Sequence, residues 1–352
     1  MFMKNNKNQM NIIKNSTKAI LLLGIAFVTI LIGIGVGSVS IPPLDIIQIL
    51  KSFFFGSPLS ETIEEIHYGM VTGIRFPRVL MAFLTGAALS MSGTVMQSVL
   101  KNPLASSYGL GVSSGAGLGA SIVMITGIGA NWFGALCLPV VGTFFGLLAV
   151  TIAVGFSACM DRSQSNNTII LSGMVVSLFL NAVMNIIAAA SPDNTRKILL
   201  WQLGTFSGKD WKSIFILAVV LVICLILFQK HSTELDIMTF GAEQALTMGV
   251  DLKKEKNFLI LLTAFLTGTA VSFSGIIGFV DLIAPHVVRK FFGSSHKWVL
   301  PMSALFGGSF MIICDLVGRT IIAPSEISVG SITALIGAPF FLYVYFMSRR
   351  RG

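Results

Sequence analysis

The feature that most constrains this chain is a series of apolar stretches, several of them long enough to cross a lipid bilayer. A transmembrane helix needs about 20 mostly apolar residues. Only 11% of the 352 residues are charged, whereas about a quarter are charged in a soluble domain. We therefore predict an all-α polytopic membrane protein with about ten membrane segments, the one at 278–290 being short. They lie at residues 18–37, 79–100, 110–128, 133–157, 167–190, 213–229, 257–276, 278–290, 298–318 and 328–348.

The distribution of positive charge predicts the topology. When the ten segments are threaded through a membrane, most of the 24 Lys and Arg residues fall on the side that carries both chain ends. The positive-inside rule then makes both termini cytoplasmic; the localisation that we expect is a bacterial inner or plasma membrane. We expect a cytoplasmic tail at 1–17, a single transmembrane domain at 18–348 and a basic cytoplasmic tail at 349–352. The net charge of +9 is spread between apolar stretches, so nucleic acid is not an expected partner.

The four cysteines stand apart in apolar sequence, at positions 137, 159, 224 and 314. Neither a CxxC motif nor a paired spacing is present. Buried, unreactive thiols are the interpretation that this pattern favours. No metal site is predicted.

An internal repeat divides the chain. Residues 82–93 read AFLTGAALSMSG and residues 264–275 read AFLTGTAVSFSG, an offset of 264 − 82 = 182 positions. The same offset relates Pro103 to Pro285. The predicted topology sends the two copies across the membrane in opposite directions, so the repeat is inverted, with halves at about 66–190 and 250–348. Inverted repeats are typical of transporters that alternate access around a central pathway.

Glycine and proline within the repeats predict broken or short helices. The residues concerned are Gly93 and Pro103 in one copy, and Gly275 and Pro285 in the other. Such breaks are tolerated at membrane depth where the backbone faces a cavity or is buried in protein. His286 follows Pro285, and capping of a broken helix is one interpretation of this histidine.

The source of energy is the next question. Ion-coupled transporters place ionisable residues inside the membrane, and here Asp281 and Asp315 are the only carboxylates within the predicted spans. A nucleotide-binding loop is also missing. The nearest candidate, GTFSGKD at 204–210, has three residues between its glycines and Asp in place of Ser or Thr. If ATP drives transport, a separate subunit hydrolyses it. The loop at about 230–256 is a candidate docking surface for that subunit, and a plain solvated connection is the alternative.

Ordered motifs extend from about residue 66 to residue 346. They are Arg75-x-Pro77-Arg78, Gly86 to Gly93, Gln97, Asn102-Pro103-Leu104-Ala105, Leu110-Gly111 with Gly115-Ala116, Leu171-Ser172-Gly173, Trp201 with Gly204, Gly241-Ala242-Glu243-x-Ala245-x-x-x-Gly249, Gly278 to Arg289, Asp315 with Arg319, Glu326 to Gly330, and Gly337-x-Pro339-Phe340. With these motifs the chain resembles the membrane permeases of type II ABC importers, which take up iron-siderophores, haem and cobalamin. Asp281 departs from the glycine that is common in this family, and Ser328 replaces a frequent proline.

The resemblance implies an assembly and several functional residues. Two permease copies, or two related permeases, would join two ATPase subunits and an extracytoplasmic binding protein. Arg75, Arg78 and Arg319 would meet acidic residues of the binding protein; interfacial anchoring is the alternative. ATPase coupling would fall to Gly241, Ala242, Glu243, Ala245 and Gly249, and the cytoplasmic gate to Asn102, Leu104, Asn166 and Asn167.

One polar stripe is visible without the resemblance. Ser177, Asn181 and Asn185 are four residues apart, which places them on one helix face. This face either lines the pathway or makes hydrogen bonds between helices.

Together these features predict the permease subunit of an ATP-driven importer for an iron-siderophore or related chelate. Haem and cobalamin remain open as cargo, and an ion-coupled secondary transporter is the alternative function. We expect no enzymatic activity and no cofactor on this chain, because ATP and magnesium would bind the partner ATPase.

Overall fold

The computed structural model describes residues 2–37, 39, 41–59, 63–129, 133–161, 164–240, 245, 247–249 and 251–349, and these residues contain no β-strand. Three short non-α turns lie at Val71–Arg75, Tyr108–Leu110 and Gly134–Leu136. The helices are α1 (Phe2–Gly35), α2 (Pro43–Phe55), α3 (Glu65–Met70), α4 (Phe76–Val99), α5 (Val112–Thr126), α7 (Cys137–Met160), α8 (Asn166–Ala190), α9 (Pro192–Gln202), α10 (Trp211–Lys230), α11 (Ser232–Phe240), α13 (Leu252–Ser274), α14 (Val280–Phe292), α15 (His296–Thr320) and α16 (Val329–Arg349).

Each of the ten predicted membrane segments coincides with one of these helices. Within the described residues, seven helices are long and apolar enough to cross a membrane, and α5 and α16 contribute shorter apolar stretches. α14 has 13 residues, too few to cross on its own because a full crossing needs about 20. The all-helical membrane architecture is therefore confirmed, while ten complete crossings stay a prediction.

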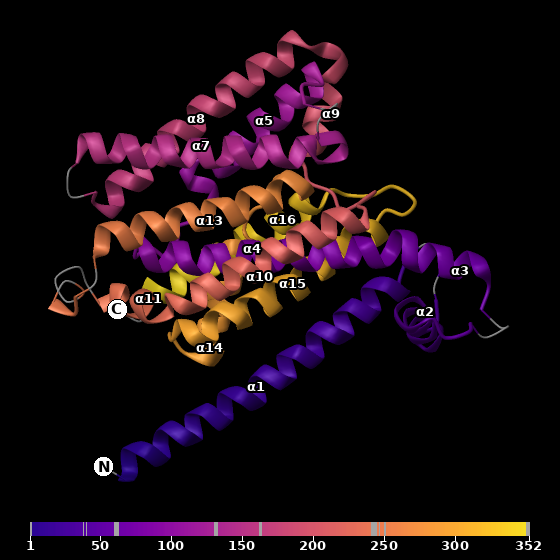
Figure 1. Ribbon diagram of the computed structural model, residues 1–352, viewed down its shortest axis with the longest axis horizontal. Helices are drawn as coiled ribbons and strands as arrows, with labels where there is room; N and C mark the ends of the chain where they lie inside the picture. The colour runs from indigo at the N-terminus through magenta and orange to yellow at the C-terminus, as the bar shows by residue number, and fades with distance from the viewer. Residues whose placement is uncertain are drawn as a thin grey trace.

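The bundle is built around α4. Most residues of this helix are buried, and α4 packs against α13, α14, α15 and α10 (Figure 1). Small residues permit the closest approach, because a Cβ at Gly86 would lie 2.2 Å from the carbonyl oxygen of Gly307 in α15. Close packing at small residues replaces the hydrophobic effect as the driving force between helices in lipid. A second layer, made of α5, α7 and α8, packs on α13 through α5 and α7.

The two copies of the repeat lie in α4 and α13. These helices pack against each other and run in opposite directions (Figure 1), as an inverted repeat requires. After the first copy the chain passes through a turn that contains Pro103. After the second copy α13 ends at Gly275, whose φ of +81° is a backbone conformation that favours glycine.

Three of the predicted helix breaks are wrong. Gly93 lies inside the continuous helix α4, where a Cβ would be 1.9 Å from the carbonyl oxygen of Asp281; the glycine serves a helix contact. Pro285 and His286 lie inside α14. Pro285 has no N–H for the Asp281 carbonyl, and Gln97 Nε2 donates to that carbonyl instead, at 3.3 Å.

Asp281 is helical despite its departure from the family pattern. The positive φ of this region, +69°, falls on Phe279, so position 281 does not need the freedom of glycine. The Asp281 side chain is buried and accepts a hydrogen bond from Ser106.

The prediction that all four cysteines are buried needs one correction, because Cys159 is exposed while the other three are buried.

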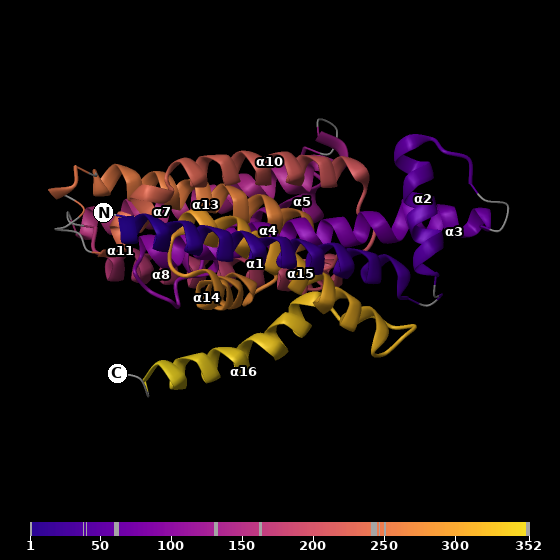
Figure 2. The ribbon, with the colours of Figure 1, turned by 90° about the horizontal axis from the view of Figure 1, so that it is seen from below.

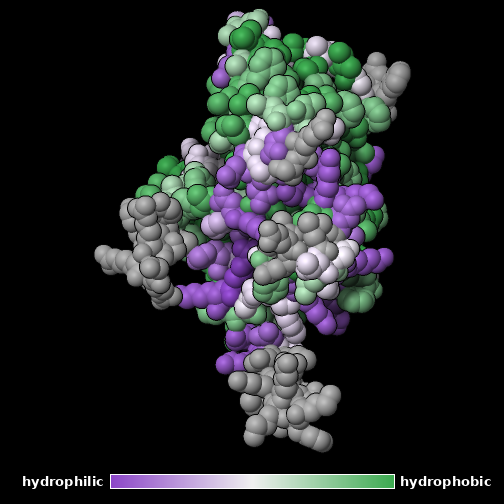
Figure 3. Space-filling model, turned by 90° about the vertical axis from the view of Figure 1, so that its left-hand side faces the viewer, coloured by the Kyte–Doolittle hydropathy of each residue, from purple (hydrophilic) through white to green (hydrophobic). Residues whose placement is uncertain are grey.

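Both chain ends lie at the same end of the bundle (Figure 2), which we call the proximal end; the opposite end is the distal end. α11 and the beginnings of α13 and α15 are proximal, whereas α2, α3 and the end of α15 are distal (Figure 1). Hydrophilic residues gather across the middle of the proximal end, below a hydrophobic region (Figure 3). This arrangement agrees with a solvated surface at that end.

Candidate functional site

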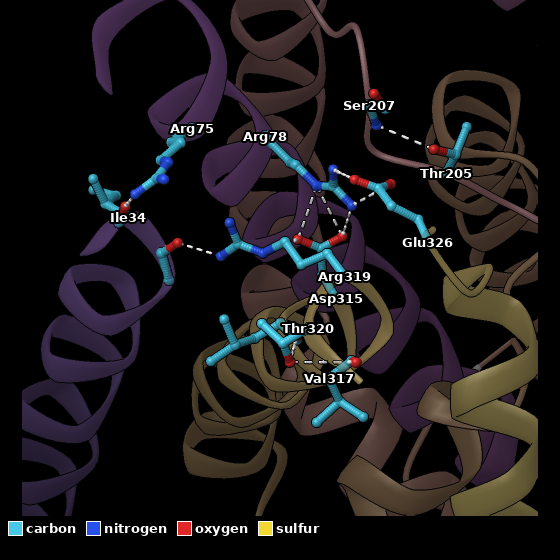
Figure 4. A network of polar contacts seen from close by, with 12 residues as sticks. Ile34, Arg75, Arg78, Thr205, Ser207, Asp315, Val317, Arg319, Thr320 and Glu326 are labelled. Atoms are coloured by element: carbon cyan, nitrogen blue, oxygen red, sulfur yellow. Dashed lines mark hydrogen bonds and ion pairs between the residues drawn. The ribbon is translucent and has the colours of Figure 1, made fainter. Parts of the chain in front are cut away.

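A buried ionic network fastens α4 to α15 at the distal end (Figure 4). Arg78 donates through Nη2 to Asp315 Oδ1 at 2.8 Å, through Nε to Asp315 Oδ2 at 3.0 Å, and through Nη1 to Glu326 Oε1 at 2.7 Å. The side chains of Arg78 and Asp315 are 11% and 2% exposed. Such multidentate pairs are the strong form of the interaction between guanidinium and carboxylate.

The other two distal arginines bind backbone carbonyls near the end of α1. Arg75 is buried, and its Nη1 donates to the carbonyls of Ile34 and Gly35 at 3.0 and 3.1 Å. A cation there satisfies carbonyls that have no partner within the helix. Arg319 donates to the Gly33 carbonyl, and its Nε lies 3.6 Å from Asp315 Oδ2. The three arginines therefore meet in one region, but their guanidinium groups already contact this chain.

Glu326 is the accessible member of the distal network. Its side chain is 44% exposed and belongs to the segment between α15 and α16. The hydrogen bond from Arg78 lowers the pKa of Glu326, outweighing partial burial, which acts in the opposite direction. Glu326 belongs to one of the sequence motifs. Its pairing with Arg78 could not be predicted, because the two residues are 248 positions apart and no local pattern connects them.

A second polar network ties four helices together at the proximal end. Asp236 Oδ1 of α11 accepts from the backbone N–H and from the Nδ1 of His296 in α15, at 2.9 and 2.5 Å. His296 Nε2 lies 2.6 Å from Ser98 Oγ of α4. Arg289 of α14 donates to Ser98 Oγ at 3.1 Å and to Gln97 Oε1 at 2.5 Å. Sequence reasoning missed Asp236 and His296, which no motif contains.

Asp236, His296 and Ser98 contact one another in the same order as the residues of a hydrolytic triad. Their surroundings, however, indicate a structural contact between helices. Ser98 and His296 are 4% and 1% exposed, so a substrate has no access to the hydroxyl. Ser98 Oγ also lies 3.0 Å from the Thr94 carbonyl and accepts from Arg289. A nucleophile needs a free approach to its substrate. This network therefore joins helices.

Two predicted gate asparagines lie at proximal helix ends. Asn102 follows α4 and its Oδ1 accepts from the Leu104 N–H at 2.9 Å, which forms a local turn. Asn166 begins α8 and its Oδ1 accepts from Lys256 Nζ at 2.8 Å; Lys256 also donates to the Gln164 carbonyl at 3.0 Å. The side chains of Leu104 and Asn167 are exposed. Lys256 was not predicted as a partner of the gate, although it is the last residue of the candidate docking loop at about 230–256.

The predicted ATPase-coupling stretch is described in part. Ala245 is fully buried, and Gly249 has a φ of +81° with open space around it. Gly241, Ala242 and Glu243 lie outside the described residues. The coupling role of all five residues stays a prediction.

The polar stripe of α8 borders a hollow of about 460 Å³. Ser177 and Asn181 line it together with Tyr108 and Ser114. Within the described chain, Ser177 Oγ is buried and has no hydrogen-bond partner. Asn185 lies two helical turns beyond Ser177 and is exposed. Two members of the stripe therefore line a hollow, and the buried hydroxyl of Ser177 is an unpaired polar group at its wall.

The chain is similar to known membrane transport proteins in sequence and in fold. The model of the FecCD transport family matches residues 25–347. An uncharacterised ABC transporter permease protein, YvrB of Bacillus subtilis, is 36% identical over 97% of each chain. The hemin transport system permease protein HmuU of Yersinia pestis is 34% identical over 79% of this chain and 83% of its own. Among solved structures, a metal-chelate type ABC transporter in an inward-facing conformation has a TM-score of 0.81 at 26% identity, covering 94% of this chain and 99% of its own.

Proposed function

Given that the chain belongs to the FecCD transport family, we propose that it is the permease subunit of an importer that takes up an iron-siderophore or a related metal chelate delivered by an extracytoplasmic binding protein. The chain is an ABC importer permease. The observation that carries the finer proposal is similarity to permeases named for hemin transport, over 79% of this chain, and for Fe(3+)-citrate and siderophore transport, over 96% and 94%. Haem and cobalamin are the alternative cargoes.

The pathway is proposed to run along the exposed polar face of α8. Ser177 and Asn181 border a hollow, and the neighbouring side chains Leu178 and Phe179 are 70% and 67% exposed. A second permease copy, or a related permease, would cover this face and complete the pathway. Asn102, Leu104, Asn166 and Asn167 would form the cytoplasmic gate. Lipid would cover the remaining apolar surface in the bacterial cytoplasmic membrane.

The proximal end is proposed to be cytoplasmic and to receive two ATPase subunits, which hold ATP and magnesium. The stretch from Gly241 to Gly249 would dock on the ATPase, and α11 immediately precedes it. Two contacts connect the neighbourhood of this stretch to the rest of the bundle. Asp236 of α11 contacts His296 of α15, and Lys256 of α13 contacts Asn166 of α8. They would carry movement of the docking stretch to α4, α14 and α8.

The distal end is proposed to receive the binding protein. Arg75, Arg78 and Arg319 would supply the positive field that attracts its acidic residues. Arg78 is the member with an exposed partner, because Glu326 covers it from the solvent side. Carboxylates of the binding protein would compete with Glu326 for the same guanidinium.

The cargo and the energy source can be tested together. The binding protein that acts with this permease would be titrated with a ferric siderophore, ferric citrate, haem and cobalamin while its intrinsic fluorescence is recorded. The cargo that quenches at the lowest concentration would then be offered to proteoliposomes containing the whole complex. We expect uptake that needs ATP and survives a protonophore. Uptake that the protonophore abolishes while ATP is present would support the ion-coupled alternative instead.

A further inference from the structure

A groove opens on the lipid-facing side of the proximal half, between α1, α14 and α15. Its volume is about 400 Å³. Several residues that line the groove are exposed to solvent, for instance Leu21 at 63% and Phe291 at 57%. The groove is therefore open at the surface. α1 passes beside α14 and α15 in this region (Figure 1). The apolar lining includes Leu21 and Ile25 of α1, Val287 and Phe291 of α14, and Phe306 and Ile313 of α15.

A positive charge stands at the proximal mouth of the groove. Lys18 Nζ donates to the Phe291 carbonyl and lies 5.9 Å from the ring centroid of Phe292. An ammonium group has three donors, and that carbonyl takes one of them. Lys14 is exposed and lies one turn nearer the N-terminus, on the same face of α1. Two lysines therefore stand where the apolar groove meets the end of the bundle.

We propose that this groove binds an anionic phospholipid. The acyl chain would lie against Leu21, Ile25 and Phe310, and the phosphate would contact Lys18 and Lys14. From Lys18 to Ile25 the groove extends about 10 Å along α1, and the apolar walls begin where the charges end. Basic residues between membrane helices on the cytoplasmic side select anionic headgroups. A soluble anion would leave the apolar walls unused, so the pattern of charge and apolar surface favours a lipid.

The test compares two lipids that differ only in headgroup charge. Purified protein in detergent would be titrated with phosphatidylglycerol or phosphatidylcholine of the same acyl chains, and bound lipid would be counted by native mass spectrometry. Phosphatidylglycerol should bind more tightly, by about fivefold for each lysine that contacts it. Lys18→Gln should remove about fivefold of this preference, and the double change with Lys14→Gln should remove most of it. Equal binding of the two lipids by the unaltered protein would overturn the proposal.

Two further variants separate the headgroup from the groove. Lys297→Gln removes a lysine at the same end of the bundle but outside the groove, and it should leave the preference unchanged. Val287→Phe fills the groove without changing charge, and it should weaken the binding of both lipids. Glycerol phosphate, which has the anion without the acyl chains, should not compete. Competition by glycerol phosphate, or loss of the preference in Lys297→Gln, would contradict a lipid site here.

Discussion

The two ends of the α4–α15 pair are fastened by different chemistry. At the distal end Arg78 holds Asp315 directly and Glu326 beside it. At the proximal end the hydroxyl of Ser98 lies between His296 and Arg289, and Asp236 holds the histidine from outside the pair. The distal centre is a charge pair almost sealed from solvent. The proximal network reaches α11 through a carboxylate whose side chain is 35% exposed.

The difference indicates where movement is possible. Removing one partner of a buried ion pair leaves an uncompensated charge and costs about 3–5 kcal/mol, so the distal centre resists separation. An exposed ion pair contributes about 0.2–1 kcal/mol, so Glu326 can exchange partners. The proximal network has buried hydrogen bonds that would be strained by displacement of α11. We therefore expect the distal end to hold α4 and α15 together while the proximal end follows the ATPase.

The largest effect should come from breaking the distal centre. Asp315→Asn leaves the buried guanidinium of Arg78 without its main counter-charge, and should destabilise the protein by about 3–5 kcal/mol. Thermal unfolding in detergent would measure this loss. Joint replacement with Arg78→Leu and Asp315→Leu should recover only part of it, because the buried Arg78 charge is then removed while Arg319 and Glu326 each lose a partner. An unchanged midpoint for Asp315→Asn would show that the pair does not fasten these helices.

Breaking the proximal contact between Asp236 and His296 should destabilise the protein less than breaking the distal ion pair. It should instead weaken the coupling between ATP hydrolysis and transport. Asp236→Ala leaves the buried His296 ring donor unpaired, a loss of about 1–3 kcal/mol. Cargo-loaded binding protein should then stimulate ATP hydrolysis less, and transport per ATP should fall. Ser295→Ala removes a neighbouring contact of Asp236 and is the matched control with normal coupling. Equal coupling in Asp236→Ala and the unaltered complex would exclude this route.

The same aspartate predicts a pH dependence. Burial raises its pKa, but the hydrogen bonds from His296 outweigh burial and lower the pKa of Asp236 below its usual value. A depressed pKa gives stability that is present above the unfolded-state pKa and is lost as pH falls through the folded-state pKa. Unfolding profiles should therefore show an acid loss below about pH 4 that is reduced in Asp236→Asn. Identical acid unfolding profiles for Asp236→Asn and the unaltered protein would contradict this prediction.

A substitution at Gly249 tests whether the stretch beside α11 engages the ATPase. Gly249→Arg adds a bulky cation at a left-handed position, where a non-glycine residue costs about 1–2 kcal/mol. The variant should insert into the membrane but lose ATPase association or coupling. Gly249→Asn is the control, since Asn tolerates this backbone conformation better. If Gly249→Arg co-purifies with its ATPase and transports normally, the coupling assignment is wrong.

The smallest effect on stability should come from Glu326. Glu326→Gln removes one exposed ion pair, worth about 0.2–1 kcal/mol, and leaves Arg78 more open to a competing carboxylate. The binding protein should therefore associate more tightly with this variant, most clearly at low salt. Surface plasmon resonance with the permease in nanodiscs would measure the change. Weaker or unaltered association would mean that Arg78 does not receive the binding protein.

Several features could be predicted because they are local in the chain. The ten apolar stretches coincide with ten helices since apolar length is a property of consecutive residues. The inverted repeat was visible as a fixed offset, and the motifs were sufficient for the family. The placement of Ser177 and Asn181 on one face of α8 followed from helical spacing alone, and both residues line a hollow; their role in the pathway stays a prediction.

Other features depended on distant partners and could not be predicted in the same way. Gly93 and Pro285 suggested helix breaks, yet one accommodates the Asp281 backbone and the other leaves a carbonyl that Gln97 satisfies from another helix. The three arginines suggested a free docking surface, but Arg78 meets Asp315 across 237 positions and Arg75 meets the end of α1. The sequence by itself determined which segments form apolar helices, because apolar length depends on local composition. Only the tertiary structure decided which polar groups pair, because in a low-dielectric interior each buried charge is stable only beside the partner that folding brings to it.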